Sequence, residues 1–559
     1  KIVSSTKRYA ENSVLSNGRW VKIRVGSTGV YQITNSELSK MGFSNPSKVR
    51  LYGYGGNILL EDLRKVKIDD LQEVPFWREP NYVLFYANGT IRWTREGKRY
   101  VQTQNHYATY GCYFLTEGNE APLDLPKEES LSEEGATIVT TYPDYALHEK
   151  EEFSWHEIGR KLFEAYNYKT GRTKTYTFNL SGITEEAVDN YDAVTFSFSV
   201  DDANAKITAG INGESLKTIG TGRWDSYDKF KEATTTVPWT KGRKEQTAVT
   251  ISVDAPASTS GHLDYIRLNY TRKLALYGSY STFRGGMTPK TKFVIAGADE
   301  NTRIWNVTDV GNYRQMLGIL SDGNYSFVAD NSEDNEYVAV NVKGTFNKVE
   351  VVGVVPNQNL HALKEIDMII IVPSLSDFEI QAERLAEVHR KVDKLRVKVV
   401  KAEQIYNEFS SGTPDATAYR RLMKMLYDRA TEETRPKYLL LFGDAAWDNR
   451  MLTNNWAKFS PANFLLCYES VNSRSETESY VAEDYFGFLD DGEGVNIGRD
   501  KLDIGIGRIP AQTLSQVKVA VDKTIDYIEN KNLGAWKNTI CMIGDDGTDG
   551  DSDANIHMM

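Results

Sequence analysis

Apolar residues follow two different periods along the chain. Up to about residue 353 they recur at every second position, as in GRWVKIRVGSTGVYQIT and DAVTFSFSVDDA, and this period is typical of half-buried strands. From Ile366 on, continuous apolar runs such as IDMIIIVPS and KYLLLFGD alternate with segments of helical spacing. Apolar strands separated by helices predict a mainly parallel sheet covered on both faces. The pattern therefore predicts a multidomain chain with a β-rich first half and an α/β second half.

Local signals predict the first elements. Gly18–Thr34 holds two alternating runs around a Gly-Ser-Thr-Gly turn, which predicts a β-hairpin. Thr34–Gly42 begins with capping residues, has a glutamate shortly after and ends with glycine, which predicts a short capped helix. Tyr52–Asn57 reads YGYGGN and is interpreted as a turn at a strand edge, not as a phosphate-binding loop. The acidic stretch Glu117–Ala136 is interpreted as a loop or linker.

Four domains are predicted from these patterns. Residues 1–136 form an N-terminal β domain. Residues 137–288 form a β-sandwich or jelly-roll-like domain, because short alternating strands are separated by turns at the spacing of a sandwich. Residues 289–364 form a small β domain or subdomain, and residues 365–559 form the α/β domain.

Composition and charge exclude several classes of protein. The 559 residues are 40% apolar and 26% charged, which is an ordinary globular mixture. Because the net charge is −11, we expect no nucleic-acid partner. No apolar run approaches the ~20 residues that a membrane-spanning helix needs. The three cysteines, Cys112, Cys467 and Cys541, are far apart, so neither a disulfide framework nor a short-spaced metal motif is predicted.

Carboxylates follow the predicted parallel strands, and ligands of such sheets bind at the carboxyl ends of the strands. Asp444 follows the run ending at Phe442, and Asp484 and Asp490 lie in the segment EDYFGFLDDGEG. These acids can converge on calcium, which takes oxygen ligands; alternatively, Asp444 caps backbone amides of its own loop. The acidic loop 545–553 allows the same two interpretations, a calcium site or a solvated helix N-terminus, but it lacks the EF-hand spacing.

Taken alone, these residues contain no complete catalytic set. The sequence has no His-Glu-x-x-His motif, no Gly-x-Ser-x-Gly elbow and no P-loop. Cys467 and Cys541 belong to apolar runs and are interpreted as buried, inert thiols, because a nucleophilic cysteine needs exposure and a lowered pKa. His389 lies on a predicted helix and is interpreted as a surface or packing residue.

A family resemblance adds to this picture. The order of IDMIIIVPS, KYLLLFGDAAWDN, DYFGFLDD, IGIGRIPAQT and ICMIGDD resembles the start of gingipain-type cysteine peptidase domains. Gly18–Gly56, with GRWVKIRVGSTGVYQITNSELSKMGF and KVRLYGYGG, resembles the N-terminal region of cell-surface sortases of the type IX secretion system of Bacteroidetes. The resemblance implies a caspase-like α/β domain and a Cys-His dyad, with the cysteine as nucleophile and the histidine as general base.

The resemblance also implies a function and a location. Such a sortase removes the C-terminal sorting domain of secreted cargo and passes the acyl group to an amine-bearing, anionic lipopolysaccharide. It acts on the outer face of the outer membrane after removal of a signal peptide. The implied partners are the outer-membrane β-barrel PorV and the attachment proteins PorQ and PorZ. Calcium binding in gingipains gives some support to the strand-end aspartates as calcium ligands.

Few site residues carry over to this sequence. In the family, the dyad histidine lies in a Gly-His-Gly motif and the cysteine follows it, both after the strand that ICMIGDD matches. Neither motif occurs in these 559 residues, so we expect the chain to stop short of its nucleophile, with an incomplete peptidase domain and no activity of its own. The resemblance implies that Asp545, or else Asp546, supports the dyad histidine. It places Asp553 near the position of a substrate-pocket acid.

Three alternatives stay open. The first is a secreted gingipain-like protease that hydrolyses its substrates. The second is a catalytically inactive surface scaffold that binds cargo, glycan or PorV through its sandwich. The third is a calcium-dependent adhesin.

Overall fold

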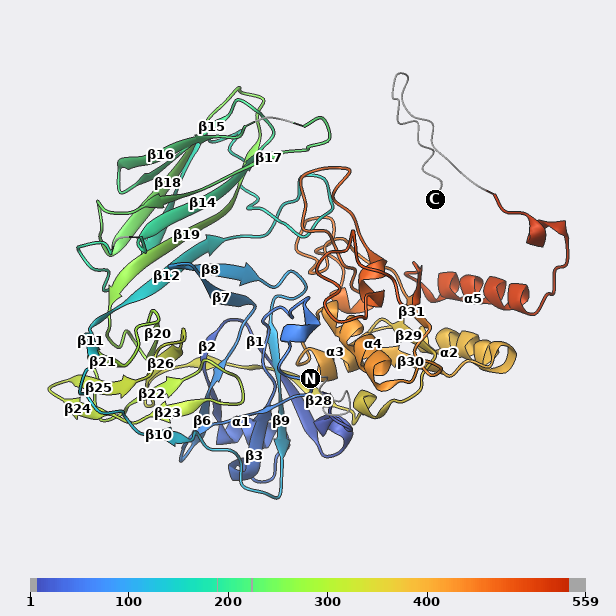
Figure 1. The fold of residues 1–559 in the computed structure, drawn as a ribbon, viewed down its shortest axis with the longest axis horizontal. Coiled ribbons are helices and arrows are strands. Elements are labelled where there is room, and N and C mark those ends of the chain that lie inside the picture. Colours follow the sequence, from blue (N-terminus) through green and yellow to red (C-terminus); the bar gives the residue numbers. More distant parts are fainter. Residues whose placement is uncertain (1–7, 189, 223–224, 542–559) are drawn as a thin grey trace.

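The protein consists of three β modules and one α/β domain (Figure 1). The computed structural model describes residues 8–188, 190–222 and 225–541. Figure 1 shows the sandwich module at the upper left, the third β module below it, the N-terminal module in the lower centre and the α/β domain on the right. The predicted fold class, a β-rich half followed by a domain with a parallel sheet, is confirmed.

Two sheets form the N-terminal module. One has the order β28 (Glu350–Val355), β1 (Trp20–Val25), β9 (Gly111–Glu117), β3 (Val49–Tyr52) and β4 (Glu73–Val74). The other has the order β27 (Asn347–Lys348), β2 (Gly29–Thr34), β6 (Tyr82–Ala87) and β5 (Trp77–Glu79). The hairpin of β7 (Ile91–Glu96) and β8 (Arg99–Gln104) extends from this module. Helix α1 (Asn35–Lys40) has the predicted capping box of Thr34 and Glu37.

The predicted hairpin at Gly18–Thr34 is wrong. Strand β1 pairs with β9 and β28, whereas β2 pairs with β6 and β27. The turn between β1 and β2 therefore crosses from one sheet of the module to the other. Val21 and Ile23 of β1 pack in the same core as Val30 and Ile33 of β2. A hairpin in one sheet would place these side chains side by side on one surface, whereas the crossing buries them between two sheets.

The next two modules are also built from paired sheets. The sandwich module contains β12 (Thr141–Glu149), β19 (Gly261–Lys273), β14 (Ala193–Val200) and β17 (Lys231–Pro238), packed against β13 (Thr173–Asn179), β18 (Gln246–Asp254), β15 (Lys206–Ile211) and β16 (Glu214–Gly220). The third module contains β10 (Lys127–Glu128), β23 (Arg314–Met316), β22 (Thr302–Asn306), β26 (Glu336–Asn341) and β20 (Tyr280–Arg284), with β11 (Thr137–Val139), β21 (Thr291–Ala296), β25 (Asn324–Ala329) and β24 (Ile319–Ser321). Strands β10 and β28 pair with strands on the far side of the predicted boundaries at 136 and 288, and β20 pairs across the boundary at 288. The boundaries stay predictions.

The α/β domain has a parallel sheet with helices on both faces. Its order is β30 (Val397–Lys401), β29 (Met368–Val372), β31 (Tyr438–Phe442) and β32 (Gly505–Ile509). Ile369 and Ile371 pack with α3 (Ala402–Phe409) and α4 (Thr417–Arg429). Ile370 and Val372 pack on the opposite face with α2 (Glu379–Val388) and α5 (Leu514–Ile528). Burial on both faces explains why the strand β29 is apolar at every position.

One strand prediction in this domain differs from the structure. The sequence places Cys541 inside a buried apolar strand, but the thiol is exposed. Ala535–Asn538 forms a 3₁₀ turn, and residues 539–541 pair with no strand in the described part of the chain. Without a neighbouring strand the apolar run has no sheet to join. The rest of that run lies outside the described residues.

The N-terminal module and the α/β domain share one hydrophobic core. Tyr107, which precedes β9, is buried in the same cluster as Ile405 of α3 and Tyr419 of α4. Ile58 and Leu59 of the N-terminal module pack against this cluster as well. The contact is therefore the interior of a common unit, not a surface between two separate domains.

The loop between α3 and α4 completes this junction. The hydroxyl of Ser411 accepts the amide of Tyr54 at 2.9 Å and donates to the carbonyl of Cys112 at 2.9 Å. The hydroxyl of Thr413 accepts the amide of Cys112 at 3.0 Å. Gly53 has a φ of +126°, and a Cβ there would lie 2.6 Å from the Ser411 oxygen. The YGYGGN turn is thus the place where the α/β domain docks.

Arg421 of α4 extends the junction. Its side chain is 6% exposed and donates to the carbonyls of Phe409, Ile68 and Asp69. Two of these carbonyls belong to the N-terminal module, so a single guanidinium joins the two parts. Buried carbonyls without a donor are costly, which makes this side chain a structural link.

We predict that Arg421→Ala lowers the free energy of unfolding by about 2–4 kcal/mol, because it leaves several buried carbonyls without donors. Urea unfolding monitored by circular dichroism measures the change. Arg384→Ala, which removes an exposed ion pair with Asp522, is the matched control and should leave the free energy nearly unchanged. Equal stability of the two variants would contradict this role of Arg421.

His361 is a second buried link at the junction. Its ring is 0% exposed, with Nδ1 2.6 Å from Glu408 of α3 and Nε2 3.3 Å from Asp69 of the N-terminal module. Burial by itself lowers the pKa of His361, but the neighbouring carboxylates of Asp69 and Glu408 outweigh it and raise the pKa to about 9. The folded protein therefore holds this imidazole protonated at neutral pH.

We predict a pH-dependent loss of stability from this histidine. Its pKa in the folded chain, about 9, lies above the unfolded value of ~6.5. The stabilisation is complete below the unfolded value and is lost as the pH rises toward 9, by roughly 3 kcal/mol in total. The free energy of unfolding, measured from pH 6 to pH 9.5, should fall in the wild type and fall less in His361→Gln. Parallel curves for the two proteins would refute the assignment.

Candidate functional site

The carboxyl ends of the parallel strands form a rim in which Asp444 joins two loops. Asp444 follows β31, and its amide donates to the carbonyl of Ala511, which follows β32, at 3.1 Å. Gln512 donates to Asp444 Oδ2 at 2.7 Å, and Ala445 donates its amide to Oδ1 at 2.9 Å. The carboxylate thus ties the exits of β31 and β32 together.

Arg508 supports the rim from strand β32. Its guanidinium makes two hydrogen bonds to Glu483, at 2.8 and 3.0 Å. It also donates to the carbonyls of Gly443 and Leu466, at 3.1 and 3.0 Å. Burial raises the pKa of Glu483, and the Arg508 charge opposes that rise. One arginine therefore fixes the segment after β31 and the start of η8 (Glu483–Gly487) relative to the sheet.

Cys467 of this domain and Cys112 of the N-terminal module are buried, as the sequence predicts for Cys467. The Cys467 thiol is buried and donates to the carbonyl of Ala446 at 3.4 Å. Burial raises the pKa of Cys467 and also that of Cys112, so both thiols stay protonated. All three cysteines are free. Between residues 8 and 541, as far as they are described, no hydrogen bond joins a cysteine to a histidine, so the rim there has no nucleophile–base pair.

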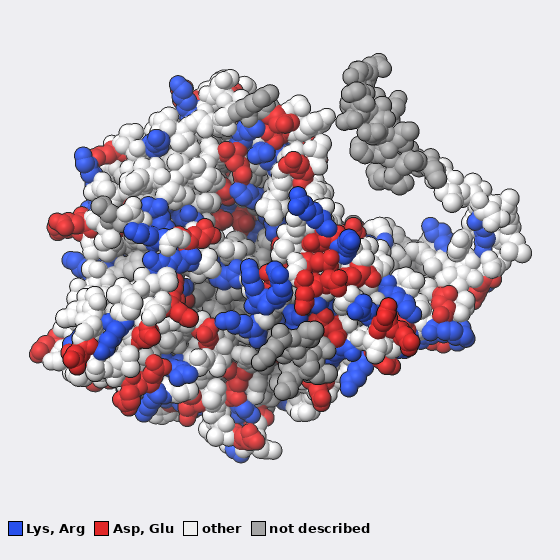
Figure 2. Space-filling model, in the orientation of Figure 1, with Lys and Arg blue, Asp and Glu red and all other residues white. Residues whose placement is uncertain are grey.

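Three carboxylates meet near the amino end of β32, at the edge of the sheet opposite the rim. One oxygen each of Asp490, Glu493 and Asp503 lies within 4.8 Å of the others, and this is the one such group of acids, histidines or cysteines in the described chain. Figure 2 shows acidic side chains gathered over the loops between β31 and β32. Asp503 Oδ2 accepts the amide of Leu489 at 2.7 Å, and Tyr427 donates its hydroxyl to Asp490 at 3.0 Å.

The predicted site residues are distributed as follows. Asp490 belongs to the three-carboxylate cluster, whereas Asp444 lies on the rim and the exposed Asp484 lies in η8, so neither is part of it. Asp545 and Asp553 lie outside the described residues. Sequence reasoning missed Glu493 and Asp503. Asp503 immediately precedes the apolar run of β32, so it lies at the amino end of that strand and not with the acids that follow strands.

Comparisons with known proteins extend this picture. Residues 361–559 match the model of peptidase family C25. The structure resembles that of dimeric latent PorU from Porphyromonas gingivalis, with 31% identity and a TM-score of 0.85, over 97% of this chain and 52% of that one. The chain thus spans about half the length of the PorU chain that it matches. No curated protein matches the sequence.

Other solved structures are far less similar. The CBM36-1 domain of a multidomain xylanase from the hindgut metagenome of Trinervitermes trinervoides is 14% identical, with a TM-score of 0.16, over 22% of this chain and 95% of that one. This score is too low to indicate a common fold. The family model and the PorU match instead agree on the α/β domain, and the PorU match also covers the modules that precede it. The α/β domain, from residue 361 on, therefore matches peptidase family C25, a family of gingipain-type cysteine peptidases, and the chain as a whole is PorU-like in its arrangement of β modules and α/β domain.

Proposed function

We propose that the protein containing this chain is a cell-surface sortase. It cleaves the C-terminal sorting domain from secreted cargo and transfers the resulting acyl group to an anionic lipopolysaccharide on the outer face of the outer membrane. The observation that supports this most is the extent of the PorU likeness, which covers the β modules as well as the peptidase domain. PorV, PorQ and PorZ are the proposed partners. No helix in the described part of the chain is long and apolar enough to span a membrane.

In the proposed mechanism, a cysteine and a histidine carry out the chemistry, and residues of the rim hold the surrounding loops in place. The cysteine of the dyad attacks the scissile carbonyl while the histidine takes the thiol proton. The C–N bond then breaks, and the histidine gives this proton to the leaving amine of the sorting domain. The acceptor amine attacks the thioester, forms a new amide bond and releases the cysteine as a thiol. Asp545 is proposed to orient that histidine and Asp553 to contribute to substrate binding. In the described rim, Arg508 and Asp444 hold the exits of β31 and β32 in place, which keeps the loops around the reacting groups fixed.

The shared core bears on the alternative of a secreted protease. A cleavable pro-segment must leave a stable peptidase behind when it is removed. Here, removal of the N-terminal module would expose Ile405 and Tyr419 and would leave Arg421 without two of its carbonyl partners. This arrangement favours a β half that stays attached to the peptidase domain. The scaffold and adhesin alternatives predict no peptidase activity, so an activity measurement distinguishes them from the sortase.

Calcium binding at the three-carboxylate cluster is proposed as well. The cluster offers hard oxygen ligands, which suits this ion. Asp490 also keeps Oδ2 free of hydrogen bonds within the described structure. An ion there would hold the segment before β32 against the loop that follows η8, at the amino end of the sheet. The bonds from loop amides to Asp503 and Glu493 pre-position their carboxylates for this role.

We predict that the full-length protein cleaves a cargo protein at its sorting domain and transfers the acyl group to glycine amide supplied as acceptor. Mass spectrometry should show a product heavier than the hydrolysed cargo by the acceptor minus water. The chain of 559 residues alone is the control and should give neither product. Hydrolysis without transfer at saturating amine would support the secreted protease, and absence of any cleavage would support a scaffold.

We predict that calcium raises the melting temperature of the chain and that Asp490→Asn reduces this rise. A ligand at 100 times its Kd stabilises the folded state by about 2.7 kcal/mol. Asp484→Asn is the matched control, because Asp484 is exposed and lies outside the cluster. A calcium effect of the same size in both variants would place the ion elsewhere, and no effect in the wild type would exclude this site.

A further inference from the structure

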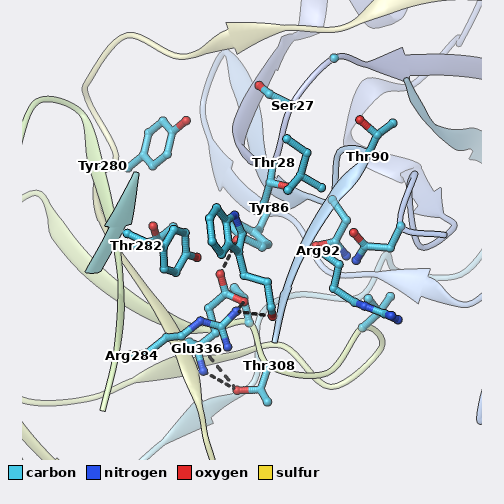
Figure 3. A pocket seen from close by; sticks show the side chains of 18 residues that line it. Ser27, Thr28, Tyr86, Thr90, Arg92, Tyr280, Thr282, Arg284, Thr308 and Glu336 are labelled. Carbon is cyan, nitrogen blue, oxygen red and sulfur yellow. Dashed lines mark hydrogen bonds and ion pairs between the residues drawn. The ribbon is translucent and has the colours of Figure 1, made fainter. Parts of the chain in front are cut away.

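A cavity of about 580 Å³ lies where the three β modules meet. The N-terminal module contributes Ser27 and Thr28 and the hairpin residues Arg92 and Trp93, while the sandwich module contributes Tyr145. The third module contributes Tyr280, Thr282, Arg284, Thr308 and Glu336, so each module supplies part of the wall (Figure 3). Small-molecule sites usually have ~300–1,000 Å³, so this cavity has the size of a ligand site far from the rim of the peptidase domain.

The two arginines of the cavity differ in their partners. Arg284 pairs with Glu336 at 2.8 Å and with Asp334 at 3.4 Å, and it lies over the ring of Tyr100. The side chain of Arg92 has no hydrogen bond or ion pair to any described residue, and its Nε is buried without a partner. Figure 3 shows the Arg284–Glu336 pair on one side of the view and Arg92 on the other. The cavity therefore carries one uncompensated positive charge.

An uncompensated, partly buried arginine is unfavourable for the folded chain alone. Burial lowers the pKa of Arg92, and no acidic group counteracts this. The carboxamide oxygen of Asn57, which also lines the cavity, is buried without a partner as well. Natural structures satisfy nearly all such groups. A ligand that brings an anion for Arg92 and a hydroxyl for Asn57 would satisfy both.

The remaining wall combines aromatic rings and hydroxyls. Trp93 stacks on Tyr145 with ring centroids 3.8 Å apart, which holds the indole in a fixed orientation. Tyr86 and Tyr280 add two further rings, and Thr90 and Thr282 add hydroxyl groups. Aromatic faces pack on the C–H surfaces of sugar rings, and hydroxyls exchange hydrogen bonds with sugar hydroxyls. A guanidinium recognises carboxylates and phosphates through paired hydrogen bonds.

We propose that this cavity binds an acidic saccharide, with Arg92 pairing with its carboxylate or phosphate and the Trp93 side of the wall packing against the sugar. The site goes beyond the peptidase function, because its residues belong to the β modules alone. Ligand binding there would connect all three modules. It would also explain a charge that weakens the unliganded fold, since functional groups are often retained at a cost in stability.

Isothermal titration calorimetry of the chain tests the proposal with glucuronic acid, glucose 1-phosphate, glucose and inorganic phosphate. At least one of the two acidic sugars should bind at least tenfold more tightly than both glucose and phosphate. Whichever acidic sugar binds more tightly identifies the acid as a carboxylate or a phosphate. Binding should quench or shift tryptophan fluorescence, because Trp93 lines the site. Phosphate binding as tight as that of the sugar phosphate, or no binding of either acidic sugar, would overturn the proposal.

Arg92→Gln should weaken binding of the acidic sugar at least tenfold. Its melting temperature should equal or exceed that of the wild type, because no partner in the described chain is lost. Arg95→Gln is the matched control: it removes a charge from the same strand at a position that does not line the cavity, and it should leave binding unchanged. Equal affinity of wild type and Arg92→Gln would overturn the assignment of Arg92.

Discussion

The burial of the α3–α4 loop against the N-terminal module is the constraint on which the rest of the structure depends. Ser411 and Thr413 satisfy backbone groups at the start of β9 that no neighbouring strand reaches, and they do so only while the loop stays docked. Because buried backbone groups must be paired, the β module and the α/β domain specify each other's conformation. The first 117 residues are thus part of the scaffold of the peptidase-type domain.

This junction also affects the position of the residues at the rim. Helices α3 and α4 cover one face of the parallel sheet, and the opposite faces of these helices contact the N-terminal module. The sheet in turn positions Arg508, which holds the loops at the carboxyl ends of the strands. A chain of contacts therefore runs from the β module through α4 and the sheet to the rim. The position of the candidate site depends on residues far from it in sequence.

The sequence predicts some of this architecture well and some of it poorly, for physical reasons. The parallel sheet is predictable because strands buried on both faces need apolar residues at every position, as in Met368–Val372. The crossing from β1 to β2 is not predictable, because the same alternating pattern is compatible with a hairpin and with a crossing between two sheets. Asp490 is visible as an acid of a polar segment between two predicted strands, but its approach to Asp503 depends on the fold of the intervening loop. The sequence around Arg92 predicts only an ordinary strand residue, because the cavity forms where three modules that are distant in sequence meet.

Native-state hydrogen exchange of the whole chain, followed by mass spectrometry across low urea concentrations, tests the central claim most directly. If the two parts share one core, amides of β1 and β9 and amides of β29 and β31 will open together, with the same free energy and the same dependence on urea. If β29 and β31 open well before β1 and β9, with a smaller urea dependence, the two parts unfold independently. That result would contradict the claim that the N-terminal module belongs to the scaffold of the peptidase-type domain.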